Sequence, residues 1–463
     1  MALYTFRRRD LTFPYPADTA FFDEEMQSAA LEALEFFAIA DLTPVVLNAR
    51  GEVNWVASDF AAKVRRVERS PLTADTYARE VDVFSRYLAA QHGKNLEDAS
   101  ELELWAYRRY RLEGPLQTRV TQTTWNKIAA ALLRLKRHLA IPGEIAWRAF
   151  RGGRDSSSGR VRMIGIEQFK EFREKGMRSS SRSPLRNVAF AELLVTTGIR
   201  CSEGAHLLVD ELPQSRRFAA HSMVELRLPA SITKGRIARV AHYSRRVANG
   251  PIRDYLDEER AHVAHRLLDR HFGSQHLSAS SLARTGDWIF FESESDRARI
   301  VAGEGVGAVK PFSHFQPEER SRLVRVTSSG RKYRPVDFAA LWLSEQRPVV
   351  SRAGWGAAFK QASARAGGPE ALGREVSPHT LRHTFAVRTL HHLLAGLVDI
   401  RRQRPLTGKR GEIYELLIGD PLRTLQHLLG HARYSSTKKY LTYMEDNAEL
   451  VVRAADGWER DLG

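Results

Sequence analysis

Two arginines in the sequence each have a polar partner three residues away. Arg200 and Glu203 stand in TGIRCSE, and His379 and Arg382 stand in SPHTLRHTF. Residues at this spacing lie on one face of a helix, where their side chains can act together. The first pair, taken alone, is typical of an ordinary intrahelical salt bridge. The second pair joins an imidazole to a guanidinium, and these groups suit the binding of an anion.

The second pair stands at the start of a predicted helix. Ser377 suits the N-cap and Pro378 the first helical position, which places His379 in the first turn and Arg382 one turn later. The positive end of the helix would then face the same anion, such as a phosphate. The alternative is a capped helix with polar side chains in water. Against it, cations beside a helix N-terminus are unfavourable unless an anion offsets their charge.

The stretch GDPLRTLQHLLGHARYSSTKKYLTYME, residues 419–445, predicts a helix, a junction and a second helix. Asp420 can cap the first helix and Gly430 can end it, which places His431 at the junction. A serine of the pair at 435 and 436 can cap the second helix.

Three tyrosines in this stretch are candidates for chemistry, at positions 434, 440 and 443. Tyr440 and Tyr443 are three residues apart on the same expected helix, so local geometry does not choose between them. A tyrosine in such a segment is usually a half-buried packing residue.

The composition indicates an intracellular protein with a polyanionic partner. The 463 residues exceed what one core usually serves, so we expect two or three domains. Lysine and arginine total 71 against 55 acidic residues, a formal charge of +16, which favours nucleic acid first and an anionic membrane surface second. An ordinary basic protein is the alternative. The single cysteine, Cys201, and the lack of a signal peptide or a membrane-length apolar run lead us to expect a cytoplasmic location.

A small all-helical domain is expected over residues 59–150, after an N-terminal extension, 1–58, to which we assign no role. Thr73 can cap its first clear helix, and Gly93 stands where that helix would stop.

Two further segments of this domain, 101–112 and 121–139, read as helices with basic outer faces. Lys127, Arg134 and Arg137 lie off the apolar stripe of the second segment and are candidate DNA contacts. For each charge singly, a solvated residue on an ordinary helix is the alternative.

A glycine, serine and arginine stretch, RGGRDSSSGR, has the composition of a flexible linker, which we place at 151–162. Beyond it, residues 163–463 read as an α+β domain. Helical patterns are followed by a β-hairpin over 224–244 with Lys234 at its turn. No nucleotide-binding loop is found, and four histidines between 262 and 276 suit a helix face better than a zinc site. We expect neither a cofactor nor a metal.

The ordered set of motifs resembles the tyrosine recombinases of the phage integrase family. Arg200 in TGIRCSE, Lys234 in a Lys-Gly hairpin, the H-x-x-R pair, and LLGH at His431 follow in the family's order. A tyrosine nine residues after His431 completes the set, which selects Tyr440. The resemblance covers roughly residues 59–450 and implies a multidomain, mainly α protein: a helical, SAM-like core-binding domain and an α+β recombinase catalytic domain.

The sequence departs from compact members of that family by two apparent insertions. They lie near 255–338 and 392–418, and we assign neither a purpose. The first insertion weakens the choice of Lys234, because Lys310 and Lys332 fall in the same long interval before the H-x-x-R pair.

The resemblance implies cutting and rejoining of DNA through a 3′-phosphotyrosyl link. Tyr440 would be the nucleophile, and Arg200 and Arg382 would neutralise charge on the phosphate. The other roles are a base, a phosphate donor, a general acid and a supporting carboxylate, implied for His379, His431, Lys234 and Glu203 respectively.

The expected partner is double-stranded DNA, held by a clamp of the two domains, with the protein as a homotetramer on DNA and other recombinases or accessory factors as further partners. No membrane partner is expected. An integrase for integration or excision of a mobile element is the leading hypothesis. A DNA-binding protein that keeps the fold without cutting is one alternative, and a type IB topoisomerase is another. A last segment, 447–462, has the spacing of a helix that packs on a neighbouring protomer or on its own domain.

Overall fold

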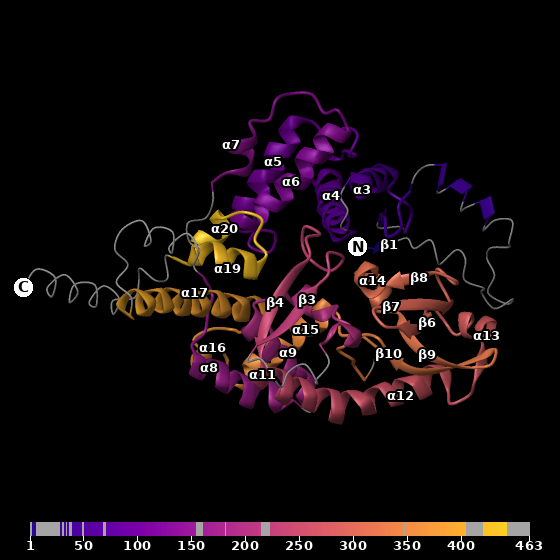
Figure 1. Cartoon of the computed structure of the whole chain (residues 1–463). Helices are drawn as coiled ribbons and strands as arrows, with labels where there is room; N and C mark the ends of the chain where they lie inside the picture. The colour runs from indigo at the N-terminus through magenta and orange to yellow at the C-terminus, as the bar shows by residue number, and fades with distance from the viewer. Residues whose placement is uncertain are drawn as a thin grey trace, which may run out of the picture. The chain divides into compact units, whose positions relative to one another are not determined.

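The computed structural model describes residues 2–5, 28–29, 32–33, 35–36, 39–48, 51–67, 71–153, 161–180, 182–213, 223–345, 348–403 and 420–441. The chain divides into two compact units, Met1–Arg160 and Val161–Gly463, and each is described by itself (Figure 1). Tyr443 and the expected C-terminal helix lie outside the described residues.

The first unit is a helical bundle with a short two-stranded ribbon. Its elements are β1 Ala2–Thr5, β2 Pro44–Leu47, α3 Trp55–Val67, α4 Pro71–His92, α5 Glu101–Glu113, α6 Gln122–His138 and α7 Trp147–Arg151. Strands β1 and β2 pair antiparallel. One core includes Phe60 of α3, Phe84 of α4, Tyr107 of α5 and Trp125 of α6, all less than 2% exposed. The boundary expected at residue 58 falls inside α3.

The helix expected from Thr73 begins two residues earlier, at Pro71. The cap assignment was therefore wrong: a proline suits the first turn of a helix because its missing N–H has no partner to lose there. The N-termini of α5 and α6 are capped by side chains of the usual capping residue types. α6 has Thr121 as its N-cap, and the Ser100 hydroxyl and Glu103 form a capping box at the start of α5.

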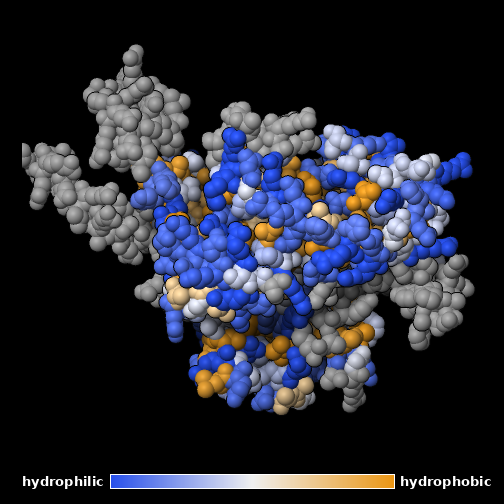
Figure 2. Space-filling model, turned by 90° about the horizontal axis from the view of Figure 1, so that it is seen from below, coloured by the Kyte–Doolittle hydropathy of each residue, from blue (hydrophilic) through white to orange (hydrophobic). Residues whose placement is uncertain are grey.

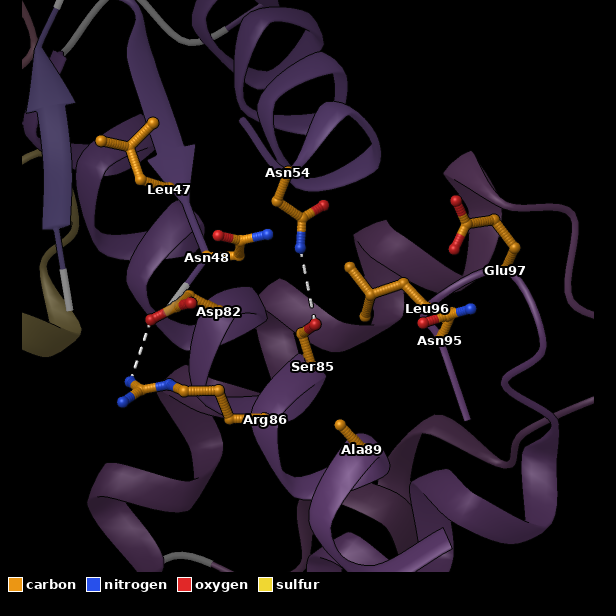
Figure 3. Close-up of a pocket in the computed structure, with 10 residues that line it drawn as sticks. All are labelled: Leu47, Asn48, Asn54, Asp82, Ser85, Arg86, Ala89, Asn95, Leu96 and Glu97. Carbon is orange, nitrogen blue, oxygen red and sulfur yellow. Dashed lines mark hydrogen bonds and ion pairs between the residues drawn. The ribbon is translucent and has the colours of Figure 1, made fainter. Parts of the chain in front are cut away.

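A polar pocket of about 450 Å³ lies in this unit between the end of β2, α4 and residues 95–97. Figure 3 shows Asn54 donating to the Ser85 hydroxyl (3.5 Å) and Arg86 paired with Asp82 (2.9 Å) along its wall. The first contact ties the residue before α3 to α4, and the second lies within α4.

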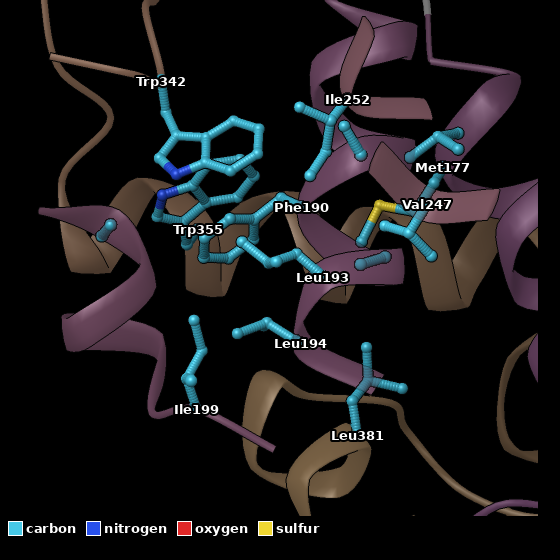
Figure 4. Packing of buried hydrophobic residues seen from close by; sticks show 14 of the residues in the cluster. Met177, Phe190, Leu193, Leu194, Ile199, Val247, Ile252, Trp342, Trp355 and Leu381 are labelled. Carbon is cyan, nitrogen blue, oxygen red and sulfur yellow. The ribbon is translucent and has the colours of Figure 1, made fainter. Parts of the chain in front are cut away.

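The second unit begins with helices that surround an aromatic core. They are α8 Ile166–Glu171, a π-helical continuation Phe172–Arg178, α9 Pro184–Thr197, α10 Cys201–Ala205, α15 Arg352–Arg365 and α16 Gly368–Leu372. Phe190 of α9 stacks on Trp355 of α15 with ring centroids 3.6 Å apart, and Trp342 meets Phe190 edge-on (Figure 4). The Trp342 indole N–H donates to the Gly204 carbonyl (2.7 Å), which fixes α10 to this core.

The expected hairpin is present as β3 Met223–Leu228 and β4 Arg239–Ser244, paired antiparallel with Met223 opposite Ser244. Lys234 lies in the connection between the strands, as predicted. Its neighbour Gly235 has a φ of +88°, a conformation that glycine adopts without strain.

The region expected as a first insertion, 255–338, folds into a helix and a six-stranded sheet. After α11 Arg245–Val247, which precedes this region, its elements are α12 Ala261–Phe272, β5 Leu277–Ser278, α13 Ala279–Ala283, β6 Ile289–Glu294, β7 Arg297–Ala302, β8 Val309–Pro311, α14 Pro317–Arg320, β9 Leu323–Ser329 and β10 Lys332–Phe338. The strand order is β5-β10-β9-β6-β7-β8, and the β6–β9 pair is parallel. Phe290 faces a core shared with α12, and Phe291 faces the opposite one, as the alternation of a strand requires.

The last described elements are α17 Pro378–Gln403, α19 Pro421–Leu429 and α20 Ser435–Lys438. Ser377 caps α17, since its hydroxyl accepts from the Thr380 N–H (3.2 Å), and Asp420 caps α19 through the Leu422 N–H (2.8 Å). Both caps were predicted. The prediction that Ser435 or Ser436 caps the next helix was wrong, because Ser435 is already the first residue of α20.

The face of the molecule in Figure 2 is largely hydrophilic, with apolar residues in scattered groups, as is usual for a folded protein surface. None of the described helices has the length and apolar character needed to cross a bilayer.

Candidate active site

Three arginines from distant parts of the second unit converge on the C-terminal end of α19. Arg239 donates to the Leu428 carbonyl (3.2 Å), Arg382 to the Leu429 carbonyl (2.6 Å) and Arg200 to the Gly430 carbonyl (3.2 Å). The last carbonyls of a helix lack intrahelical partners and carry the negative end of its dipole, so cations are favourable there. These bonds bring the LLGH stretch to Arg200 and Arg382.

Glu203 lies beneath two of these arginines. Its carboxylate is fully buried, pairs with Arg200 Nη1 (2.9 Å) and Arg239 Nη2 (2.5 Å), and accepts from the Arg200 backbone N–H (2.7 Å). The expected Arg200–Glu203 contact is therefore present. Charge-assisted hydrogen bonds of this number fix the planes of the two guanidinium groups.

Two glycines make the arginine contacts possible. Gly198 and Gly430 both end helices with positive φ values, +62° and +60°, and each offers its carbonyl to an arginine. A Cβ on Gly430 would lie 2.5 Å from Arg239 Nε, and one on Gly198 would lie 2.1 Å from a ring carbon of Phe385. Neither position has room for a side chain.

Tyr440 lies inside this unit, 1% exposed, in the turn that follows α20. The expectation that a helix carries it was wrong, because α20 is a single turn that ends at Lys438. The ring of Tyr440 lies nearly parallel to that of His431, with the two centroids 6.3 Å apart. Lys439 Nζ lies 5.1 Å from the centroid of the Tyr440 ring. The Tyr440 hydroxyl is 3.0 Å from Nδ1 of His383. By contrast, Tyr434 is exposed on the surface.

The histidines of the site are held neutral at neutral pH. Burial, followed by the charges of Arg382 and Arg200, lowers the pKa of His431 to about 3. Burial and the neighbouring His379 lower the pKa of His383 to about 3 as well. Desolvation and the cations Lys439, Arg382 and Arg200 also lower the pKa of His379, whose outer side is exposed on the first turn of α17.

The remaining groups show how strongly positive the site is. Burial and the charge of Arg200 lower the pKa of Arg382 to about 10, which leaves it protonated at neutral pH. Burial raises the pKa of the Tyr440 phenol, while Arg382 and Arg200 act in the opposite direction. A phenol that stays protonated in the resting site must lose its proton as it reacts.

Lys234 is exposed in the β3–β4 connection, five residues before Arg239. Lys310 and Lys332, the other two lysines considered for the role of general acid, lie on the six-stranded sheet. Lys310 pairs with Glu319 (2.6 Å) on β8, and Lys332 is on β10. A lysine that the sequence did not single out, Lys439, is nearer in the chain to Tyr440, and burial and Arg382 lower its pKa.

The candidate DNA contacts of the first unit all lie on α6. Lys127 and Arg137 are exposed, whereas the Arg134 guanidinium lies 5.4 Å from the centroid of the Tyr77 ring.

Sequence reasoning missed Arg239 and His383. Arg239 gave no local signal, because its partners are 36 and 189 residues away. His383 did give one: it stands four residues after His379, on the same helical face, and the two rings lie 4.2 Å apart.

Comparisons with known proteins agree with the motifs. Residues 59–140 match the family model for the phage integrase N-terminal SAM-like domain. The tyrosine recombinase XerD of Corynebacterium glutamicum is 30% identical over 168 residues, which cover 35% of this chain and 43% of that protein. This chain thus spans less than half the length of the curated relative it matches.

Solved structures of recombinases also match this chain at low identity. The XerH site-specific recombinase bound to palindromic difH, a post-cleavage complex, is 15% identical with a TM-score of 0.49 and covers 98% of this chain and 93% of its own. The Tn1549 transposon integrase in complex with circular intermediate DNA is 12% identical with a TM-score of 0.43, over 83% and 94%. The domain match and the XerD relative confirm the resemblance of this chain to the tyrosine recombinases.

Proposed function

We propose that the chain is a site-specific DNA recombinase that cleaves and rejoins strands through a 3′-phosphotyrosyl intermediate. The observation that carries the proposal is the convergence of one buried tyrosine, Tyr440, with Arg200, Arg382 and His431 in a chain that resembles the tyrosine recombinases. These groups come from three separate segments of the sequence. A packing role for Tyr440 alone does not require them to meet.

The two arginines would bind the scissile phosphate. A phosphodiester is anionic, and negative charge grows on its non-bridging oxygens as the tyrosine attacks. Each guanidinium carries five N–H donors, and the carbonyls of Gly198 and Leu429 accept from two of those on Arg382. These two bonds fix the plane of the Arg382 guanidinium before DNA binds. Donors that are already oriented can stabilise the charge of the transition state without first reorganising.

His431 would add a third donor. The Thr437 hydroxyl, 2.9 Å from Nδ1 of His431, can donate to that nitrogen. The proton of the neutral ring then stays on Nε2, from which it can be donated to the phosphate. Glu203 would orient Arg200 and take no proton in the reaction.

The reaction exchanges one phosphodiester for another. The Tyr440 oxygen bonds to phosphorus, the bond from phosphorus to the 5′-oxygen breaks, and the phenolic proton passes to a base, with His379 as the candidate. The 5′-oxygen must gain a proton, for which we propose Lys234 on the β3–β4 connection. Reversal by another 5′-hydroxyl rejoins the strand without ATP, because the phosphotyrosyl bond keeps the bond energy.

The partner in this proposal is duplex DNA, gripped mostly through its phosphates by the core-binding helices and the catalytic unit. Exchange of strands between two duplexes requires several protomers, and we propose a tetramer on DNA. Integration or excision of a mobile element is the proposed use.

A covalent capture assay tests the proposal. A library of duplexes of random sequence, each with one nick at a fixed position, is incubated with the protein, and complexes that resist SDS are recovered and sequenced. A nicked strand loses its short 5′-hydroxyl fragment on cleavage, so the adduct accumulates. We expect wild-type adducts that share a sequence and none from Tyr440→Phe.

Two outcomes would overturn the proposal. An adduct that persists in Tyr440→Phe would place the nucleophile elsewhere. Salt-sensitive DNA binding by the wild type without any adduct would instead support a DNA-binding protein that keeps the fold and does not cut.

A further inference from the structure

Within the described part of the chain, the hydroxyl of Tyr440 forms a hydrogen bond with the side chain of His383, which is not one of the motif residues named above. The Nδ1 atom of His383 lies 3.0 Å from the phenolic oxygen, and the two rings meet at 60° with centroids 5.6 Å apart. His383 is 5% exposed. A hydrogen bond between two buried groups is shielded from competition by water.

The hydroxyl of Tyr440 is buried with its ring, and part of that ring packs on apolar side chains. Tyr440 belongs to a core cluster with Leu425 and Leu429 of α19 and with Ala386 and Leu390 of α17. A buried hydroxyl without a partner is unfavourable, whereas phenylalanine would fill the same space without that cost. The bond to His383 is therefore what keeps a tyrosine stable in this position.

His383 is held in place from two sides. It is adjacent to Arg382 on α17, whose guanidinium is anchored to Gly198 and Leu429, and its ring lies 4.2 Å from that of His379. The imidazole is neutral, because burial and the nearby His379 and Lys439 lower its pKa. A neutral imidazole with its proton on Nε2 offers Nδ1 as an acceptor.

We propose that His383 is a positioning residue that accepts the phenolic O–H of Tyr440 at Nδ1 and holds the nucleophile inside the site of its own chain. This inference rests on the proposed function, since it gives Tyr440 the role of nucleophile. In this arrangement His383 forms a hydrogen bond with the hydroxyl of the nucleophile, and the arginines bind the phosphate. Its loss frees the tyrosine to leave the position from which it attacks.

The two nitrogens of the ring allow a matched test. Asparagine places a polar atom near the position of Nδ1, glutamine places one near the position of Nε2, and leucine keeps the volume without a polar atom. We expect His383→Asn to keep most of the adduct rate. We expect His383→Gln and His383→Leu to form adduct more slowly by about tenfold or more, as the loss of one buried hydrogen bond allows.

Stability distinguishes positioning from packing. If His383 only filled space, leucine would be the best replacement, and the adduct rate would follow the melting temperature. The proposal requires the opposite ranking, in which asparagine forms adduct faster than leucine although a buried amide lowers the melting temperature more. His391→Leu, an exposed histidine on the same helix, controls for the loss of an imidazole from α17.

The assay uses the full chain and the nicked duplex recovered by covalent capture. An equal adduct rate in His383→Leu and the wild type would overturn the proposal while leaving the recombinase function intact. Rates that follow melting temperature in all three variants would also overturn it. Absence of an adduct from the wild type would refute the proposed function itself, so the two failures are distinguishable.

Discussion

Replacing Glu203 by glutamine is expected to destabilise the second unit strongly. The carboxylate is fully buried and pairs with Arg200 at 2.9 Å and Arg239 at 2.5 Å, and these side chains are 25% and 10% exposed. Glutamine keeps the shape and removes the charge, so two partly buried cations lose their counterion. Breaking a buried pair by neutralising one partner costs about 3–5 kcal/mol. We expect a loss of stability near the lower end of that range, because Arg200 keeps some contact with water.

The measurement is calorimetric unfolding of the full chain, in which the transition of the second unit is followed. A matched control is Glu225→Gln, whose carboxylate is 63% exposed on β3 and lies 4.0 Å from His242. An exposed pair of this kind contributes roughly 0–1 kcal/mol. If Glu203→Gln were no more destabilising than Glu225→Gln, the argument that this carboxylate holds the arginines in place would fail.

A double-variant cycle isolates the part due to Arg239. Arg239→Met removes one cation and keeps much of the side-chain volume. If the two residues act on each other, the cost of Glu203→Gln must be smaller in the Arg239→Met background, by on the order of 1 kcal/mol or more. Additive costs would show that Glu203 acts through Arg200 alone.

Three other predictions follow from the site. Gly430→Ala places a methyl against Arg239 at a residue with φ of +60°, so adduct formation by covalent capture should fall sharply, while Gly235→Ala, with open space around it, should keep the adduct rate although its φ of +88° lowers stability slightly. The pKa of buried His383 is about 3, so between about pH 6.5 and pH 3 this histidine binds a proton in the unfolded chain but not in the folded one. Stability should therefore decrease as pH falls through this range, by at most about 1.4 kcal/mol per pH unit for this group. The urea midpoint measured between pH 7 and 5 should depend less on pH in His383→Asn than in the wild type. Because Tyr440 lies in the site of its own chain, a mixture of Tyr440→Phe and Arg382→Ala protomers should yield no adduct in the capture assay; recovery of adduct would show attack in trans.

The local parts of the site could be predicted from sequence because their signals are local. The caps at Ser377 and Asp420, the end of α19 at Gly430 and the Arg200 contact to Glu203 depend on residues two to four positions apart. At that range the rules of helix ends apply directly.

The parts that failed depend on tertiary contacts or on competing local signals. Tyr440 was assigned to a helix, yet its ring packs in an apolar core after one turn of α20, and burial there outweighs the helical preference of the segment. Arg239 was invisible because its role exists only when β4, α10 and α19 meet. The sheet over 277–338 was seen only as extra length. Strands β6 and β9 begin with consecutive buried residues and end with partly or fully exposed ones, so that no clean alternation marks them.

The charge balance of the site connects its resting structure to its proposed substrate. Arg200, Arg239, Arg382 and Lys439 bring four positive charges to the site, and Glu203 is the acidic residue that acts on Arg382. The helix carbonyls of residues 428–430 supply partial negative charge that offsets part of this excess. Burial is the first cause of the lowered pKa values of His431, His383 and Arg382, and the remaining positive charge lowers them further. In the proposed function a phosphodiester would supply the negative charge that offsets this excess, so the same repulsion among the cations would favour binding of the DNA backbone at this position.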